Sequence, residues 1–380
     1  MVLKESSTYK IGAYTIVAIL VTLVGTTSVL FTPYITVDTA RHDAWITPFT
    51  SFLLGLYVIF VCCWLGSIFP DKGFIEYLPL IMGKFMGKLI GFGYILFFLW
   101  FTVTVLAEAL ALLFGIGIFR LTPELAVGLL LLIATTYAVS YGIECISRSI
   151  WYVWLITVVF FAAAVFMAAP MVNLSILQPV GESGLSAILK SGLLSHAFKG
   201  EMLFLVILFP YVHSRRDALA GGIIALVLLT IFISLTIVLC ITIMGVETTA
   251  RSYFSIFSLG DYLEATGIKI VLATTWILIF WGKVTLGQFA LTIGLSQLCG
   301  FNSNRALILP VAMLLLILSQ VFYPSATDLF SHVGDSFPGL ALFTEYLIPG
   351  LLLLVAVTRQ KLGQLDNQPQ QVQAPPASQS

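Results

Sequence analysis

Long apolar runs alternate with short polar connections along almost the whole chain. A helix that crosses the apolar core of a bilayer needs about 20 mostly apolar residues, and by that measure the sequence predicts ten spanning helices. Their predicted limits are 11–37, 45–69, 88–118, 123–141, 146–169, 191–212, 218–245, 267–298, 306–323 and 336–358. The pattern therefore predicts an all-α integral membrane protein with a single transmembrane domain over residues 1–362.

The two ends of the chain depart from this apolar pattern. The first ten residues are polar and precede an apolar run too long for a cleaved signal peptide, so we expect that run to remain as the first spanning helix. After Lys361 the sequence turns to Gln, Pro, Ala and Ser without an apolar period. Such a segment cannot bury enough apolar surface to offset its chain entropy, which predicts a disordered cytoplasmic tail over residues 363–380.

Composition agrees with a membrane protein and excludes several other classes. Hydrophobic residues make up 59% of the chain and charged residues 9%, with a mean hydropathy of +1.04. A soluble domain carries about 25% charged residues, so an ordinary soluble enzyme, a nucleic-acid binder and a disordered protein are excluded. The 5 Cys and 4 His residues lack the spacing of metal ligands. Because hydrolase and nucleotide-binding motifs are also absent from the sequence, we expect neither an enzyme nor a bound metal or cofactor.

Positively charged residues in the connections predict the orientation, because cytoplasmic loops of membrane proteins are enriched in Lys and Arg. If the N-terminus is cytoplasmic, 11 basic residues fall in cytoplasmic segments and 5 in outer segments. The cytoplasmic set is Lys4, Lys10, Lys72, Lys84, Lys88, Arg148, Arg215, Arg216, Arg305, Arg359 and Lys361. The outer set is Arg41, Arg120, Lys190, Arg251 and Lys269. We therefore expect both termini on the cytoplasmic side.

Two of the predicted helices contain a glycine beside polar residues. In the first helix Gly25 precedes three hydroxyl residues, and in the sixth helix Gly200 lies between Lys199 and Glu201. The three hydroxyl residues are Thr26, Thr27 and Ser28. Each glycine lies in the first helix of a group of five, which is typical of transporters that contain two inverted five-helix repeats.

This arrangement predicts repeats over about 11–169 and 191–358, with helices one and six discontinuous. Free backbone groups at such interruptions must line a polar cavity or be capped by side chains, because lipid offers them no partner. The alternative is that both glycines lie in unbroken helices and only allow neighbouring helices to pack closely.

Few ionisable residues lie inside the predicted spans. They are Glu108, Lys199, Glu201 and Lys283, with Glu345 nearer the outer end of the tenth span. A charge at the bilayer centre costs about 3 kcal/mol or more, so each of these groups needs a partner or a function. The charges on helices three, six and eight are expected either to pair across the bundle or to recognise a zwitterionic or polar ligand, and the sequence leaves both interpretations open.

Several short motifs, taken in their order, resemble the spore germination permease family. They are GTTSVLFTP at 25–33, PDKGFIEYL at 70–78, MGKFMGKLIG at 82–91, YGIECISR at 141–148, FKGEMLF at 198–204 and FPY at 209–211. The resemblance extends over roughly residues 8–360. The family comprises the B subunits of nutrient germinant receptors in endospore-forming bacteria.

The resemblance implies a ten-helix protein similar to the amino acid–polyamine–organocation transporters, with helices one and six unwound around a ligand site. It also implies a location in the inner spore membrane, in complex with an A subunit and a lipoprotein C subunit. The germinant would be an amino acid, a sugar, a nucleoside or an ion. By position, Gly25 to Ser28 match the family's first-helix break, and Gly200 with Glu201 match its sixth-helix break.

We therefore predict that a small polar nutrient binds midway between helices one and six. Exposed N–H groups at 25–28 would bind its carboxylate, because the N-terminal end of a half-helix carries partial positive charge. Glu201, with help from Glu108, would accept its amine or hydroxyl, and aromatic side chains would close the cavity. The predicted ligand-binding residues are Gly25, Thr26, Thr27, Ser28, Glu108, Phe198, Gly200, Glu201, Trp276 and Lys283.

Two other functions fit the same residues. A proton-coupled amino acid symporter would use Glu108 or Glu201 as its proton carrier. A structural membrane scaffold that holds the A subunit would bind no ligand at all. The sequence does not separate the first alternative from a sensor, because both functions need the same cavity.

Overall fold

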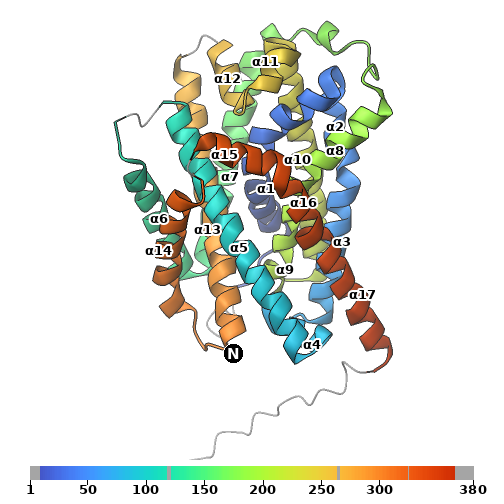
Figure 1. The fold of residues 1–380 in the computed structure, drawn as a ribbon, viewed down its shortest axis with the longest axis vertical. Coiled ribbons are helices and arrows are strands. Elements are labelled where there is room, and N and C mark those ends of the chain that lie inside the picture. The colour runs from blue at the N-terminus through green and yellow to red at the C-terminus, as the bar shows by residue number, and fades with distance from the viewer. Residues whose placement is uncertain (1–8, 118–120, 263–265, 324, 364–380) are drawn as a thin grey trace, which may run out of the picture.

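The computed structural model describes residues 9–117, 121–262, 266–323 and 325–363, and within these ranges the chain is a bundle of helices (Figure 1). No strand is formed there, although an isolated parallel bridge joins Ile11 to Val212. Backbone hydrogen bonds accompany this bridge, from the Ile11 N–H to the Tyr211 carbonyl over 2.7 Å and from the His213 N–H to the Ile11 carbonyl over 3.0 Å. They fasten the start of the first helix to the end of the sixth.

Each predicted span overlaps helical structure, and some of the spans cover several consecutive helical segments. The long helices are α1 (Ala13–Ala40), α3 (Phe52–Ile68), α5 (Lys84–Gly115), α6 (Glu124–Tyr141), α7 (Ile143–Ala168), α8 (Gly184–Gly200), α10 (Arg215–Met244), α13 (Thr266–Cys299) and α14 (Arg305–Val321). Helix six continues from α8 through η4 (Glu201–Phe204), α9 (Leu205–Leu208) and η5 (Phe209–Tyr211). Helix ten consists of α15 (Ala326–Ser331), η6 (His332–Ser336), α16 (Phe337–Ala341), η7 (Leu342–Leu347) and α17 (Ile348–Lys361).

Short helices occupy the connections. They are η1 (Arg41–Ile46), α2 (Thr47–Thr50), α4 (Phe74–Met82), η2 (Ala169–Met171), η3 (Leu174–Leu177), α11 (Val246–Arg251) and α12 (Ser255–Tyr262). The helix α4 lies at the opposite end of the bundle from α11 and α12 (Figure 1). This is the arrangement expected when the second and seventh connections lie on opposite sides of a membrane.

The described residues contain eight stretches long and apolar enough to cross a membrane. The first of them, Ala13–Ile68, holds two of the predicted spans, and Arg305–Val321 is a shorter apolar helix. The protein is therefore an all-α, multi-pass membrane protein, whereas the two inverted five-helix repeats remain a prediction. The predicted disordered tail at 363–380 lies outside the described residues, apart from Gly363 at its start.

Helix one is not broken, so the predicted discontinuity at Gly25 is wrong. The helix α1 runs without interruption from Ala13 to Ala40, and every residue from Ile16 to Pro33 is buried. The Thr26 hydroxyl donates to the Thr22 carbonyl one turn earlier, which keeps this polar group inside the helix. A Cβ atom on Gly25 would lie 3.2 Å from Leu229 Cδ2 of α10, so this glycine serves close packing between helices.

Helix six does change its winding where the sequence predicts a discontinuity. The α-helical turn ends at Gly200, and the tighter 3₁₀ turn η4 begins at Glu201. Such a mid-helix 3₁₀ stretch often marks a functional hinge. Helix ten is also irregular, because the wider π turns η6 and η7 interrupt it, and π turns inside helices are frequent at functional sites.

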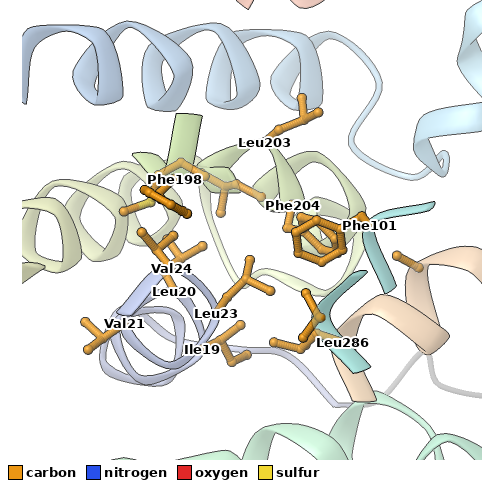
Figure 2. Packing of buried hydrophobic residues seen from close by; sticks show 14 of the residues in the cluster. Ile19, Leu20, Val21, Leu23, Val24, Phe101, Phe198, Leu203, Phe204 and Leu286 are labelled. Carbon is orange, nitrogen blue, oxygen red and sulfur yellow. The ribbon is translucent and has the colours of Figure 1, made fainter. Parts of the chain in front are cut away.

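Apolar packing fixes the elements that surround the irregular part of helix six. Leu20 and Val24 of α1 face Phe198 of α8, and Phe204 of η4 packs against Phe101 of α5, with ring centroids 5.0 Å apart (Figure 2). Each of these side chains is buried. Because closely packed interiors transmit small displacements, a shift of η4 must be accommodated by α1 and α5.

The buried carboxylate of Asp43 in η1 holds the long connection between helices five and six. Its Oδ1 accepts a hydrogen bond from the Gly181 N–H over 2.7 Å, and its Oδ2 accepts one from the Ser183 N–H over 2.9 Å. The Ser183 hydroxyl donates in turn to the Ala40 carbonyl over 2.7 Å. The connection is thereby tied to the end of α1, which the sequence pattern did not indicate.

Candidate functional site

A buried ion pair joins α13 to the start of η4. Lys283 Nζ lies 2.8 Å from both Oε1 and Oε2 of Glu201, and the two side chains are 0% and 2% exposed. Lys283 Nζ also donates to the Thr27 hydroxyl of α1 over 2.5 Å. The winding change after Gly200 therefore places a carboxylate against a cation from another helix, and one cluster ties together α1, η4 and α13.

An aromatic wall encloses this ion pair. Lys283 Nζ lies 5.2 Å from the centroid of the Phe101 ring, in the geometry of a cation–π contact. The cavity beside the pair is lined by Trp100, Phe101, Thr104, Val105, Glu108, Phe198, Glu201, Lys283, Val333 and Phe337. Its free volume is ≈ 10 Å³, about the space that a single water needs. A larger ligand can enter only if the walls move.

A second carboxyl group faces the same cavity. Glu108 of α5 is 3% exposed, and its Oε2 has no hydrogen-bond partner among the described residues. It interacts electrostatically with both Lys283 and Glu201. The predicted proximity of the charges on helices three, six and eight is therefore present in the structure, where one ammonium group and two carboxyl groups line the same cavity.

Three of the predicted ligand-binding residues lie around a different cavity. Gly25, Thr26 and Trp276 line an apolar cavity of ≈ 50 Å³ between α1, α7, α10 and α13. The Trp276 indole N–H donates to the Thr26 carbonyl over 3.2 Å, so it anchors the backbone of α1. The structure thus separates these residues from Phe198, Glu108, Glu201 and Lys283, which line the cavity beside the ion pair.

The remaining predicted residues have other surroundings. Ser28 is buried, and its hydroxyl has no hydrogen-bond partner within the described part of the chain. Gly200 lies against helix ten, where a Cβ atom would collide with the Glu345 carboxyl group and approach the Tyr346 ring to 2.7 Å. Thr27 alone among the hydroxyl residues of α1 contacts the ion pair directly, through Lys283.

Lys199 is buried, at only 2% exposure, and its hydrogen-bond acceptors among the described residues are neutral. Its ammonium group donates to the Pro48 carbonyl, and to the Thr230 hydroxyl over 3.4 Å. These bonds connect α8 with α2 and α10. Lys199 is therefore a contact between helices and does not line the cavity beside the ion pair.

Sequence reasoning identified Glu108 but missed the other α5 residues that line the cavity. Phe101 and Thr104 line the cavity, and the Thr104 hydroxyl lies 2.7 Å from the Tyr323 hydroxyl. Both lie one or two helical turns before Glu108, and side chains three, four and seven residues apart share one face of a helix. That spacing is the signal from which this lining could have been found.

Comparisons with known proteins agree with a germination-related membrane protein. A family model described as spore germination protein matches residues 11–327. Spore germination protein KB of Bacillus subtilis is 27% identical over 352 residues, covering 88% of this chain and 91% of the relative. Spore germination protein B2 of the same organism is 24% identical, covering 92% and 95%.

A solved structure has a similar fold. It is that of MHP1, a nucleobase-cation-symport-1 family transporter, in a closed conformation with bromovinylhydantoin bound. The TM-score is 0.69 at 10% sequence identity, and the match covers 91% of this chain and 78% of the transporter. At this identity the likeness shows a transporter-like fold and leaves ligand and activity to be argued from the residues.

Proposed function

Because the chain belongs to the spore germination protein family, we propose that it is the nutrient-sensing membrane subunit of a germinant receptor. In this function it binds a small polar germinant, such as an amino acid, and signals to the A and C subunits of the receptor. The proposal includes a location in the inner spore membrane with both termini in the cytoplasm. The family and the transporter-like fold support its general outline.

The single observation that carries the proposal is the Lys283–Glu201 ion pair, enclosed beside a small cavity. Removing one partner of a buried pair leaves an uncompensated charge, which costs about 3–5 kcal/mol. A zwitterionic ligand avoids this cost because it supplies both charges at once. Its carboxylate would contact Lys283 and the Thr27 hydroxyl, while its amine would contact Glu201 and Glu108.

Side chains, rather than backbone N–H groups, provide the anion site in this proposal. The helix α1 is continuous through residues 25–28, so the N–H groups there belong to its own hydrogen-bond ladder. In this proposal the ammonium group of Lys283 binds the ligand carboxylate, which the sequence assigned to those N–H groups. Phe198 remains suited to close the cavity, whereas Trp276 contacts the other side of α1.

Ligand binding would change the connection between three helices. In the closed cluster Lys283 holds Glu201 and Thr27 together, and a ligand inserted between the charges separates η4 from α13 and α1. A ligand shifts such an equilibrium only through its different affinity for the two arrangements. The small free volume of the closed cavity provides that difference, because only an opened arrangement accommodates the ligand.

A thermal-shift screen of the purified full-length protein tests this proposal, with amino acids, sugars, nucleosides and simple salts as probes. We expect saturable stabilisation by one class of polar compound, because a ligand that binds only the folded state raises its apparent stability. Glu201→Gln should abolish the stabilisation. Glu144→Gln is the matched control, because the Glu144 carboxylate forms an exposed ion pair with the Arg148 guanidinium group, 2.7 Å away. Stabilisation that persists in Glu201→Gln would contradict the site.

Uptake into proteoliposomes distinguishes sensing from transport, which the transporter-like fold keeps as the second candidate function. Binding without uptake of the radiolabelled ligand supports a sensor. Concentrative uptake driven by a proton gradient, and lost in Glu108→Gln or Glu201→Gln, would instead identify a symporter. If no compound in the screen binds saturably to either the purified protein or the assembled receptor, the scaffold function is favoured.

A further inference from the structure

Glu345 is a buried carboxyl group outside the cavity described above. It lies in the π turn η7 of helix ten, within the candidate span Ala326–Lys361, and is 0% exposed. Neither of its oxygens has a hydrogen-bond partner among the described residues. A carboxylate with neither solvent nor partner is too costly to retain its charge inside a membrane. The position therefore requires an explanation other than structural pairing.

The carboxyl group points at the place where helix six changes its winding. It lies so close to Gly200 that a side chain at that position would collide with Oε2. The next residue, Tyr346, donates from its hydroxyl to the His196 carbonyl of α8 over 2.7 Å. The two contacts place the Glu345 carboxyl group against the boundary between α8 and η4.

Among the described residues, the titratable groups around Glu345 provide no free positive charge. Those that interact with Glu345 electrostatically are Glu201 of η4, Lys283 of α13, Cys62 of α3, Tyr94 of α5 and the adjacent Tyr346. His196 of α8 contacts the Tyr346 ring, with centroids 5.2 Å apart. Lys283 is the cation in this set, and its ammonium group is already held by Glu201 and Thr27. Ionised Glu345 would therefore add a negative charge beside a carboxylate that already has its partner.

We propose that Glu345 is a proton-binding site within the membrane, which holds its proton while helices six and ten are packed as in this structure and releases it when that contact opens. In the closed arrangement the neutral acid fits an unsolvated position against Gly200. When η7 moves away from α8, water reaches the carboxyl group, the O–H bond breaks, and the proton passes to water while the carboxylate is solvated. Proton release and movement at the discontinuity of helix six are thereby coupled.

This inference goes beyond the proposed ligand site and does not depend on the identity of a germinant. Glu345 does not line the cavity beside the ion pair. The coupling requires only that Gly200 and Glu345 are in contact in the closed arrangement. A negative result for Glu345 therefore leaves the proposed ligand site intact, and a negative result for the ligand site leaves the Glu345 proposal intact.

Infrared spectroscopy of the full-length protein in lipid membranes tests the protonation state directly. At neutral pH we expect an absorbance band from protonated carboxylic acid. Glu345→Gln should lower the intensity of this band by the contribution of one carboxyl group. Glu108→Gln must be measured in parallel, since Glu108 is also buried. Glu182→Gln, at an exposed position of the outer connection, is the control and should leave the band unchanged. If the wild type lacks the band, or if Glu345→Gln retains it in full, the proposal is wrong.

Hydrogen exchange tests the coupling. In the wild type, raising the pH until the Glu345 band disappears should coincide with a step of at least several-fold in exchange of the amides around Gly200, beyond the intrinsic pH dependence. Glu345→Gln cannot ionise, so it should lack this step. The same step in Glu345→Gln would overturn the coupling. If Glu345→Gln fails to fold, the titration of the wild-type band against exchange still decides the matter, because the two must change together.

Discussion

Lys283 and Thr27 lie 256 residues apart in the chain, yet the Lys283 ammonium group donates to the Thr27 hydroxyl over 2.5 Å inside the bundle. The same ammonium group holds both oxygens of Glu201. This one side chain therefore joins helices one, six and eight. Because all three groups are buried, any change that separates them alters the energy of the whole helix arrangement.

Replacing Lys283 by Met should destabilise the protein by about 3–5 kcal/mol, because it leaves the Glu201 carboxylate buried and unpaired. Combining it with Glu201→Met should recover most of the loss, since no charge then remains uncompensated. The measurement is a double-mutant cycle by thermal or denaturant unfolding of the purified protein.

Arg148→Met provides the control for that cycle. Arg148 pairs with Glu144 at the surface, and such exposed pairs contribute about 0–1 kcal/mol. Equal losses for Lys283→Met and Arg148→Met would contradict a special energetic role of the buried pair.

Gly200→Ala should lower stability by about 1–3 kcal/mol, the usual cost of overpacking. Its Cβ atom would collide with the Glu345 carboxyl group and the Tyr346 ring, so helix ten has to move. The matched control is Gly339→Ala in α16, where a Cβ atom meets nothing within 4 Å. Melting temperatures of the two variants provide the comparison, and an unchanged value for Gly200→Ala would refute the close contact.

Asp43→Ala should loosen the connection between helices five and six. Two backbone N–H groups, of Gly181 and Ser183, lose their acceptor, and a hydrogen bond to a charged group contributes about 1.5–3 kcal/mol. Hydrogen exchange at these two amides should accelerate by at least tenfold. Asp71→Ala, at an exposed position, is the control and should leave these amides protected.

Acidification should release the contact between Glu247 of α11 and Arg41 of η1. The neighbouring guanidinium group lowers the pKa of the Glu247 carboxyl below its ordinary value. A carboxyl whose pKa is lower in the folded state stabilises above its unfolded pKa, and the contribution disappears as the pH falls through the folded value. Both groups are exposed, so the effect should be small and sensitive to salt.

Thermal melting of the wild type and Glu247→Gln at several pH values measures this contribution. The difference between the two proteins should be present at neutral pH and low salt. It should vanish in acid, where the wild-type carboxyl is protonated too. A difference in melting temperature that grows on acidification would contradict the predicted sign of the pH dependence.

The sequence alone determined the membrane class, the all-α architecture and the winding change after Gly200. These features follow from local properties: the length of an apolar run decides whether a helix can cross a bilayer, and glycine is unfavourable in the interior of a helix. The correct order of short motifs also indicated the family, which the match over residues 11–327 shows.

The tertiary structure decided which polar groups meet. Thr26 and Thr27 are neighbours in sequence, but consecutive residues of a helix point about 100° apart. As a result Thr26 lines the cavity near Trp276, whereas Thr27 contacts Lys283. Helix one stays continuous because Gly25 packs closely against Leu229 and the Thr26 hydroxyl donates within the helix, which no local pattern reveals. No local pattern reveals the surroundings of Glu345 either, because its contact with Gly200 of another helix forms only in the packed bundle. Burial and contact partners are properties of that bundle.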